Sequence, residues 1–162
     1  MALKIENTHG WNAERLLAMW PSILTNLRKF VASLSDDLTE RFVVEAIMSG
    51  RNTLWVVYEE ETPEIAVLCI LTEIKKNDAT GRIFVEVTGM GGNRVHECLP
   101  LGRDIEDWAM ENYGATEMLM IGRMGWRKVM KHHGYEEKAV IMKKKLEVPS
   151  HGREQQQQSV SE

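Results

Sequence analysis

The sequence contains little cysteine. Only Cys69 and Cys98 occur among its 162 residues, and they form no Cys-X-X-Cys spacing. Two isolated thiols exclude the disulfide framework of small secreted proteins and supply no zinc-binding pattern. The five histidines also lack a ligand spacing such as His-X-X-X-His. We therefore expect two buried or half-buried thiols in a reducing compartment, and no metal site.

Long apolar runs are missing as well. No stretch approaches the ~20 apolar residues that span a bilayer, and the first ten residues, MALKIENTHG, lack the apolar core of a secretory signal. We therefore expect a cytoplasmic protein without a membrane partner. The formal net charge of −4 disfavours nucleic acid as a partner, because phosphate binding needs a basic surface. The run Lys143–Lys145 is interpreted as a solvated strand end, with a phosphate contact as the alternative.

Two helices are predicted in the first third of the chain. Apolar residues recur at helical spacing from about Asn12 to Leu34, where Pro21 predicts either a kink or a junction of two short helices. A second helix is predicted from Leu38 to Met48 and ends before Gly50. Three strands rich in β-branched and apolar residues follow, separated by polar turns: Thr53–Glu59, Ile65–Ile74 and Arg82–Met90.

The second half of the chain alternates between helix and strand. A helix that begins late, near Leu101 or Arg103, ends at Gly114. It is followed by a strand, a short helix closed by Gly134, and a final strand: Thr116–Ile121, Trp126–His133 and Tyr135–Leu146. The order α-α-β-β-β-α-β-α-β predicts an α/β fold with a mixed central sheet and helices on both faces. Residues 1–147 are assigned to this domain, and the polar residues 148–162 to a disordered tail.

Glycines near the end of the chain form a pattern. Gly122, Arg123, Gly125 and Trp126 precede Gly134–Tyr135, and the stretch WAMENYGATEMLMI lies before them. Together with the element order, this pattern resembles the GNAT superfamily of acyl-CoA-dependent N-acetyltransferases, and most of all GNAT-like proteins encoded by tailed phages. The resemblance implies transfer of acetyl from acetyl-CoA to an amine on a small molecule or protein, in the host cytoplasm. The alternative is a catalytically inactive GNAT-fold phage protein, a structural component of the virion or a host-interaction partner; a homodimer also stays open.

The resemblance also implies a cofactor site. The strand Arg82–Met90 would separate from its neighbour and bind the pantetheine arm, and the loop GMGGNR after it would bind the pyrophosphate. The implied cofactor-binding residues are Val87, Thr88, Gly89, Gly91, Gly92, Asn93, Arg94 and Arg123. The loop departs from the family pattern, since Pro100 and Gly102 delay the helix. A plain glycine-rich turn is the competing interpretation.

Acetyl transfer to an amine needs a base and is helped by an acid. Strand alternation places Glu86 opposite Val85 and Val87, and a desolvated carboxylate there would be a suitable base. A solvated or salt-bridged glutamate is the other interpretation. The acid position of the resembled family is occupied by Met130, which has no proton to give. Tyr135 and His132 are the predicted catalytic acids, and His133 and His96 are further candidates.

Overall fold

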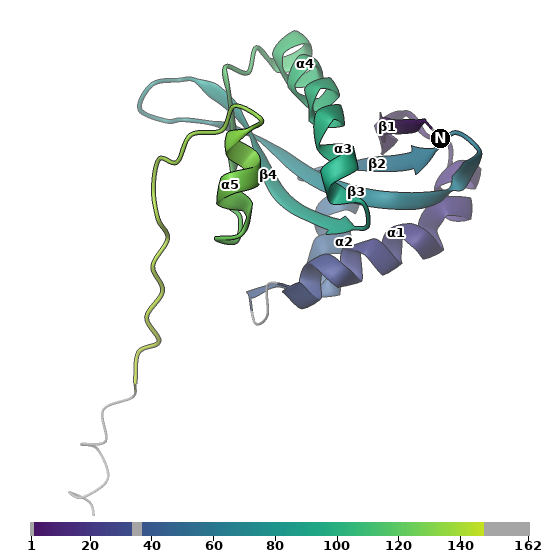
Figure 1. The fold of residues 1–162 in the computed structure, drawn as a ribbon, viewed down its shortest axis with the longest axis horizontal. Helices are drawn as coiled ribbons and strands as arrows, with labels where there is room; N and C mark the ends of the chain where they lie inside the picture. The colour runs from purple at the N-terminus through teal and green to yellow at the C-terminus, as the bar shows by residue number, and fades with distance from the viewer. Residues whose placement is uncertain (1, 34–36, 148–162) are drawn as a thin grey trace, which may run out of the picture.

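The computed structural model describes residues 2–33 and 37–147. Five strands form one sheet in the order β1-β2-β3-β4-β5, which is also their order in the chain. Their bounds are β1 Leu3–Asn7, β2 Thr53–Glu59, β3 Thr62–Lys76, β4 Ile83–Gly92 and β5 Glu117–Met120. Strands β1 to β4 pair antiparallel, and β5 joins β4 in parallel, so the sheet is mixed as predicted. Figure 1 shows helices on both faces of this sheet, which is also as predicted.

Helices α1 (Ala13–Ser33) and α2 (Glu40–Met48) cover one face of the sheet. The apolar stripe of α1 supplies Met19, Ile23, Leu27 and Phe30 to a core that also contains inward side chains of β2 and β3. One helix runs through Pro21, so the alternative of two short helices is wrong. The side chain of Thr39 caps α2 by accepting a hydrogen bond from the amide of Phe42 at 3.2 Å.

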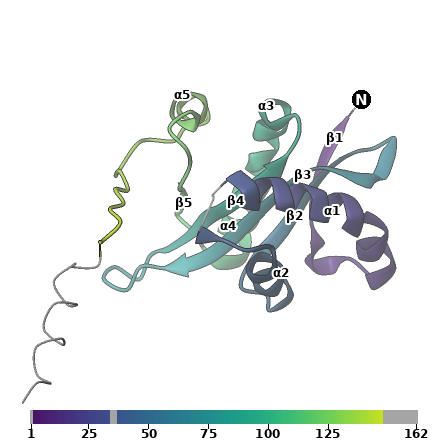
Figure 2. The same ribbon diagram turned by 90° about the horizontal axis from the view of Figure 1, so that it is seen from below.

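The other face is covered by α3 (Val95–Cys98), η3 (Leu99–Leu101) and α4 (Gly102–Tyr113). Ile105 and Ala109 of α4 pack against side chains of the sheet, including Val85 and Val87. The predicted late start of this helix is confirmed, and Gly114 ends it with a φ of 65°. The short turn of α3 before it was not predicted. Figure 2 shows β1 and β5 at opposite edges of the sheet.

The two ends of the chain depart from the predicted element order. Leu3–Asn7 forms β1, which was not predicted; it pairs along its length with β2 but has too few apolar residues to be recognised alone. The prediction of a final strand at Tyr135–Leu146 is wrong, because this segment forms no strand and follows α5 (Trp126–Lys131) away from the sheet. Val140, Ile141 and Met142 there are 62%, 70% and 89% exposed. Strand propensity alone does not order such a segment, because it depends on cross-strand neighbours.

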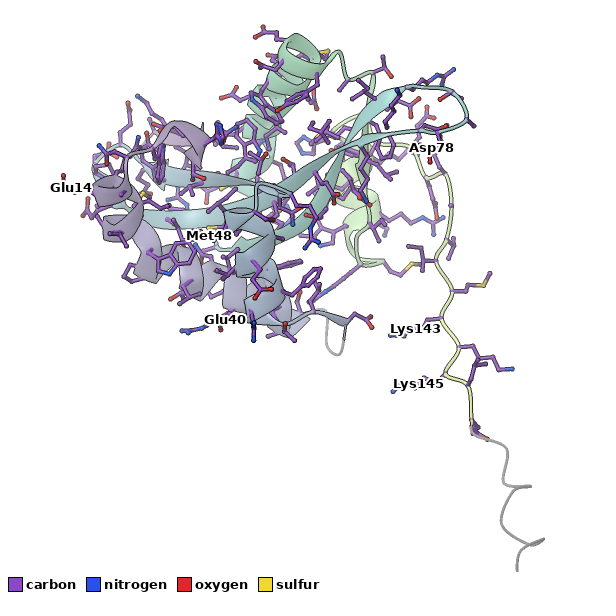
Figure 3. The ribbon with its side chains drawn as sticks, turned by 180° about the vertical axis from the view of Figure 1, so that it is seen from behind. Glu14, Glu40, Met48, Asp78, Lys143 and Lys145 are labelled. Atoms are coloured by element: carbon purple, nitrogen blue, oxygen red, sulfur yellow. The ribbon has the colours of Figure 1, made fainter. Side chains whose placement is uncertain are left out.

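Lys143, labelled in Figure 3, links this extended segment to the body of the protein. Its Nζ donates a hydrogen bond to Asp37 Oδ1 at 2.8 Å. The region assigned to a tail, residues 148–162, lies outside the described residues. Within the described ranges, no helix has both the length and the apolar character to cross a membrane.

Candidate active site

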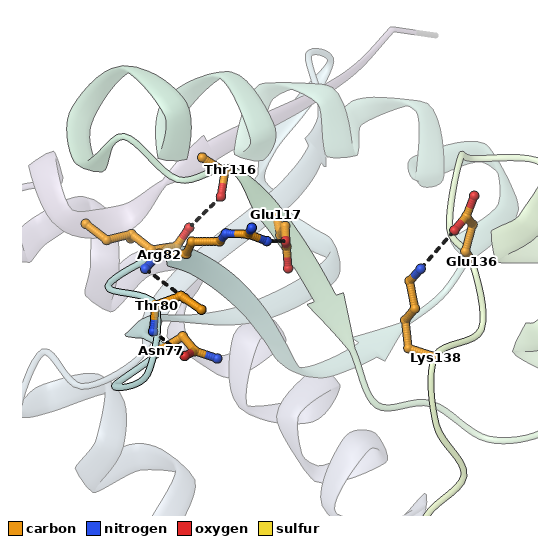
Figure 4. Close-up of polar contacts among 8 residues, drawn as sticks. Asn77, Thr80, Arg82, Thr116, Glu117, Glu136 and Lys138 are labelled. Carbon is orange, nitrogen blue, oxygen red and sulfur yellow. Dashed lines mark hydrogen bonds and ion pairs between the residues drawn. The ribbon is translucent and has the colours of Figure 1, made fainter.

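Strands β4 and β5 are held together at one end and separate at the other. The pairing begins at Phe84 and Glu117 and stops at Val87 and Met120, whereas β4 continues to Gly92. At the paired end, the amide of Thr116 donates to the carbonyl of Ile83 at 2.9 Å. An ion pair of 3.3 Å between Arg82 and Glu117 crosses the same place (Figure 4). Residues 88–92 consequently have no strand beside them on the β5 side within the described chain.

A β-bulge at Thr88 lies where the two strands part. On β3, Leu71 pairs with Gly89 but Thr72 pairs with Val87, so Thr88 has no partner in the register. Its hydroxyl donates to the carbonyl of Leu71 at 3.3 Å. An extra residue of this kind shifts the alternation of side chains along the strand. Val87 before the bulge and Met90 after it therefore both pack on the α4 face.

The bulge turns the predicted cofactor-binding glycines towards α1. A Cβ atom on Gly89 would lie 2.4 Å from Cζ of Phe30, and one on Gly91 would lie 2.2 Å from the backbone oxygen of Asn26. Gly92 has a φ of 146°, and a Cβ there would lie 2.5 Å from the carbonyl oxygen of Val67. These three glycines thus let the helix and the neighbouring strand approach β4 closely.

The loop after β4 holds its own arginine in ion pairs. Arg94 has a left-handed backbone with a φ of 53°, and its guanidinium contacts Glu97 at 2.7 Å and also Glu59. The hydrogen bonds that Arg94 donates to Glu97 and then to Glu59 raise the pKa of Arg94 above its usual range. The positive charge that was expected to face a phosphate is therefore neutralised by two carboxylates.

A lysine that the sequence did not indicate reaches the same loop. Nζ of Lys29 donates to Oδ1 of Asn93 at 2.9 Å, and the Asn93 amide donates to the carbonyl of Val67 at the same distance. Lys29 is 64 residues away in the chain and lies on α1. No local pattern could have found it, because its place depends on how α1 packs against the sheet.

A cavity of about 250 Å³ lies on the α4 face beside the parted strands. It is bounded by β3, β4, β5, η3, α4 and the region of α5, and its walls include Val87, Met90, Met120, Met130, His133 and Tyr135. Two side chains of the predicted acid region, Met130 and Tyr135, thus share one cavity. The amide of Tyr135 donates to the carbonyl of Met130 at 3.2 Å, which fixes the phenol next to the end of α5.

Tyr135 contributes a phenol to the wall of this cavity. Burial, followed by the negative charge of Glu106, raises the pKa of Tyr135 to about 12. The phenol is accordingly protonated throughout the neutral range. His133 also lines the cavity, whereas His132 is an exposed C-cap of α5 and is absent from the cavity wall.

Glu86 lies apart from the cavity. It is 8% exposed, is not among the cavity residues, and forms an ion pair with Lys75 of β3. Glu86 is thus a salt-bridged glutamate, which was the alternative interpretation to a desolvated base. The hydrogen bond with Glu86 raises the pKa of Lys75. Because Glu86 alternates with Val85 and Val87, its side chain points to the face opposite Tyr135.

Arg123 is also apart from the cavity. Its Nη2 donates to the carbonyl of Ser33 at 2.8 Å, so it caps the last turn of α1 and anchors the segment between β5 and α5. The structure therefore divides the predicted site residues between the α4 face, the loop after β4 and contacts with α1.

Both thiols are buried and free, as predicted. Burial raises the pKa of Cys69 to about 12 and that of Cys98 to about 11, so neither is a reactive thiolate at neutral pH. Across residues 2–33 and 37–147, histidine, cysteine and acidic side chains form no group of three or more that could hold a metal ion.

The backbone is similar to solved N-acetyltransferases. Glucosamine-6-phosphate N-acetyltransferase from Arabidopsis thaliana has a TM-score of 0.59 at 13% identity, and aminoglycoside 6′-N-acetyltransferase from Acinetobacter baumannii has 0.62 at 13%. A ribosomal-protein-alanine N-acetyltransferase from Brucella melitensis has 0.54 at 10%. Each similarity covers 91% of this chain and 100% of the other. No protein-family model matches the sequence, and no curated protein matches it.

These similarities identify the fold. A mixed five-stranded sheet in which a parallel fifth strand parts from the fourth is the GNAT acetyltransferase fold. The acceptors in the three names differ in kind: an amino-sugar phosphate, an aminoglycoside and a protein alanine. The fold by itself therefore does not specify a substrate.

Proposed function

We propose that this protein is an acyl-CoA-dependent N-acetyltransferase that transfers acetyl from acetyl-CoA to an amine. One observation carries the proposal: the unpaired edge of β4 at residues 88–92 borders a cavity that contains the protonated phenol of Tyr135. An open strand edge offers amides that bind an extended chain by adding to the sheet. A protonated acid next to that edge can assist the departure of a thiolate.

The residues present fit the pantetheine arm and thioester of acetyl-CoA better than its pyrophosphate. The open edge of β4 and the apolar cavity walls, with Val87 and Met90, suit a pantetheine arm and a thioester. The pyrophosphate would lie at the loop from Gly92 to Arg94. Arg94 is already paired with two carboxylates in this loop. The positive charge for the pyrophosphate would therefore come from Lys29, which contacts Asn93.

The transfer step requires two proton movements. Once the ammonium form has released one proton to give the neutral amine, transfer forms a C–N bond between the amine nitrogen and the acetyl carbon and breaks the C–S bond to coenzyme A, so the amine loses a further proton and the thiolate gains one. Tyr135 is the proposed proton donor to the sulfur. It would take the role of the tyrosine that the resembled family has at the position of Met130. Glu86, on the other face of β4, is the proposed acceptor of the amine proton. To act in this way it would give up its ion pair with Lys75.

The alternative is a GNAT-fold protein without catalysis that contacts a phage or host protein. Its support is the loop after β4, where two carboxylates neutralise the arginine expected at a phosphate. In either case we propose that the protein acts in the cytoplasm, of a bacterial host if it is phage-encoded, and a homodimer is compatible with both.

Acetyl-CoA binding tests the proposal. At a concentration ~100-fold above its dissociation constant, acetyl-CoA should stabilise the protein by about 2.7 kcal/mol, which a thermal-shift assay detects. Lys29→Gln should reduce this shift, whereas Lys76→Gln, an exposed lysine at the end of β3, should not. A folded protein whose melting temperature does not change in millimolar acetyl-CoA would favour the non-catalytic alternative.

A further inference from the structure

A second cavity, of about 300 Å³, lies on the face of the sheet covered by α1 and α2. Its walls combine Phe30 of α1, Phe42 and Val43 of α2, Leu71 and Glu73 of β3, and Thr88 of β4. The bulged Thr88 separates it from the first cavity, which is bordered by Val87 and Met90 of the same strand. The two cavities thus lie on opposite faces of β4 at the level where β5 ends.

Most of this cavity is apolar and partly aromatic. Phe30 is buried, and Phe42 is 48% exposed at the rim. The guanidinium of Arg51 stacks on the ring of Phe42 at 4.6 Å and is itself exposed to solvent. Two rings at one opening favour a ligand with a flat apolar body, because such a body buries its area against them.

Two polar residues of the cavity, Asn52 and Glu73, carry oxygen acceptors. Asn52 lines the wall, and its Oδ1 is buried without a hydrogen-bond donor among the described residues. A buried acceptor of this kind is stabilised by a ligand that donates a hydrogen bond. A small rotation of the Asn52 side chain would present this oxygen to an N–H or O–H group on the occupant.

Glu73 adds a negative charge to the same wall. Its side chain is 27% exposed, and its Oε2 is 3.8 Å from Nζ of Lys75, which lies closer to Glu86. One lysine thus faces two carboxylates, and the other charged residue of the cavity wall is Arg51, whose guanidinium is exposed to solvent. The exposed guanidinium of Arg51 at the rim is screened by water, so a cation inside the cavity is attracted mainly by Glu73.

We propose that this cavity binds the acceptor substrate, and that the acceptor is a small primary amine on an aromatic or similarly flat apolar body. Its ammonium group interacts with Glu73 and Asn52, and its apolar body packs between Phe30 and Phe42. This assignment rests on the proposed acetyltransferase function, in which the thioester lies across β4 in the first cavity. The parted ends of β4 and β5 are the route by which the two substrates meet.

Three probes of similar shape and different charge test the assignment. Calorimetric titration without acetyl-CoA should show binding of 2-phenylethylamine, at least about 10-fold weaker binding of 2-phenylethanol, and no binding of 3-phenylpropanoate. Equal binding of the amine and the alcohol would overturn the proposal, because the charge of Glu73 would then play no part.

Two variants locate the binding site. Glu73→Gln should weaken 2-phenylethylamine about 10-fold and leave 2-phenylethanol unchanged, whereas Glu64→Gln, an exposed carboxylate on the same strand, should affect neither. Asn52→Ala should weaken the binding of 2-phenylethylamine. The melting temperature should be maintained, because the substitution also removes the Oδ1 that lacks a hydrogen-bond donor. Unchanged amine affinity in both Glu73→Gln and Asn52→Ala would place the amine elsewhere and overturn the assignment.

Acetylation of the probe separates this inference from the proposed function. Mass spectrometry after incubation with acetyl-CoA should detect N-acetylated 2-phenylethylamine. If acetyl-CoA shifts the melting temperature and other amines are acetylated, but 2-phenylethylamine does not bind, the acceptor assignment fails and the acetyltransferase proposal stands. If the amine binds through Glu73 but acetyl-CoA does not bind, the cavity is a site for amines and the acetyltransferase proposal fails.

Discussion

The two faces of β4 differ sharply at Gly89 and Gly91, just beyond Thr88, where the second cavity ends. On the α1 side, Gly89 and Gly91 leave no room for even one carbon atom, because Phe30 and the backbone of Asn26 fill the space. On the α4 side, Val87 and Met90 border a cavity of about 250 Å³. The glycines serve close packing of the helix on one face, and the opening on the other face follows from the early end of β5.

The largest expected effect comes from filling the closed face. Gly91→Val should lower the free energy of unfolding by about 3 kcal/mol or more, or prevent folding, because the new side chain meets the backbone of α1 and not a movable side-chain end. Chemical denaturation measures the change. Gly102→Ala is the control, since a Cβ there has no neighbour within 4 Å. A Gly91→Val protein as stable as the parent would show that the two elements do not approach this closely.

The open face should respond in activity with little change in stability. Tyr135→Phe should slow thiol release from acetyl-CoA by roughly 10²-fold, the lower part of the range for general acids. Its melting temperature should change by only a few degrees, since the ring is retained. The matched control is Tyr113→Phe on the outer side of α4. Equal rates in the two variants would remove Tyr135 from the mechanism.

The pH dependence of the same side chain has a defined sign. The folded-state pKa of Tyr135, about 12, is above the ordinary value of 10.0 for a tyrosine. Its contribution to stability is therefore complete below pH 10 and is lost as the pH rises through 12. Thiol release by the parent protein should accordingly show no decline from Tyr135 ionisation between pH 7 and about pH 10. A fall with a midpoint near pH 8 would show that the proton comes from a group other than Tyr135.

A smaller effect is expected where the start of α1 joins the sheet. Glu6 of β1 accepts hydrogen bonds from Trp11 and Tyr58 and pairs with Arg15 at 2.8 Å. Desolvation raises the pKa of Glu6, but the hydrogen bonds from Arg15, Tyr58 and Trp11 outweigh it and leave the pKa lowered. The stability that Glu6 contributes is present above pH ~4.5 and is lost as the pH falls through its folded-state pKa.

Melting temperatures from pH 7 to pH 3 measure this contribution. Glu6→Gln should be less stable than the parent at pH 7, and the difference should narrow as the pH falls. The control is Glu14→Gln, an exposed carboxylate in the first turn of α1 (Figure 3). A difference that stays constant down to pH 3 would mean that the ionised form of Glu6 does not stabilise the fold.

The smallest effect is expected from the end of the chain. Removal of residues 148–162 should change the melting temperature by less than ~5 °C, because this polar segment has little apolar surface to bury. Thermal unfolding of the shortened and the full chain tests this directly. A larger decrease would show that the segment packs on the domain and would contradict the boundary at residue 147.

Much of the fold was predictable because its signals are local. The helical spacing of Ile23, Leu27 and Phe30, and the β-branched strands that follow, indicated which segments fold and in what order. The resemblance of the region around Gly134–Tyr135 to the GNAT superfamily correctly indicated the fold. Strand prediction from the sequence failed at β1 and at Tyr135–Leu146. Pairing with a neighbouring strand decides whether such segments are strands.

The sequence by itself determined the fold class, the order of most elements and the absence of a proton at Met130. Only the tertiary structure decided what the glycine-rich strand does. The bulge at Thr88 inverts the alternation and turns Gly89 and Gly91 against α1, a distant segment of the chain. The packing of α1 on the sheet also brings Lys29 to the loop after β4, where Arg94 is paired with carboxylates. The physical reason is that side-chain direction and charge pairing depend on contacts between distant segments, which no local pattern contains.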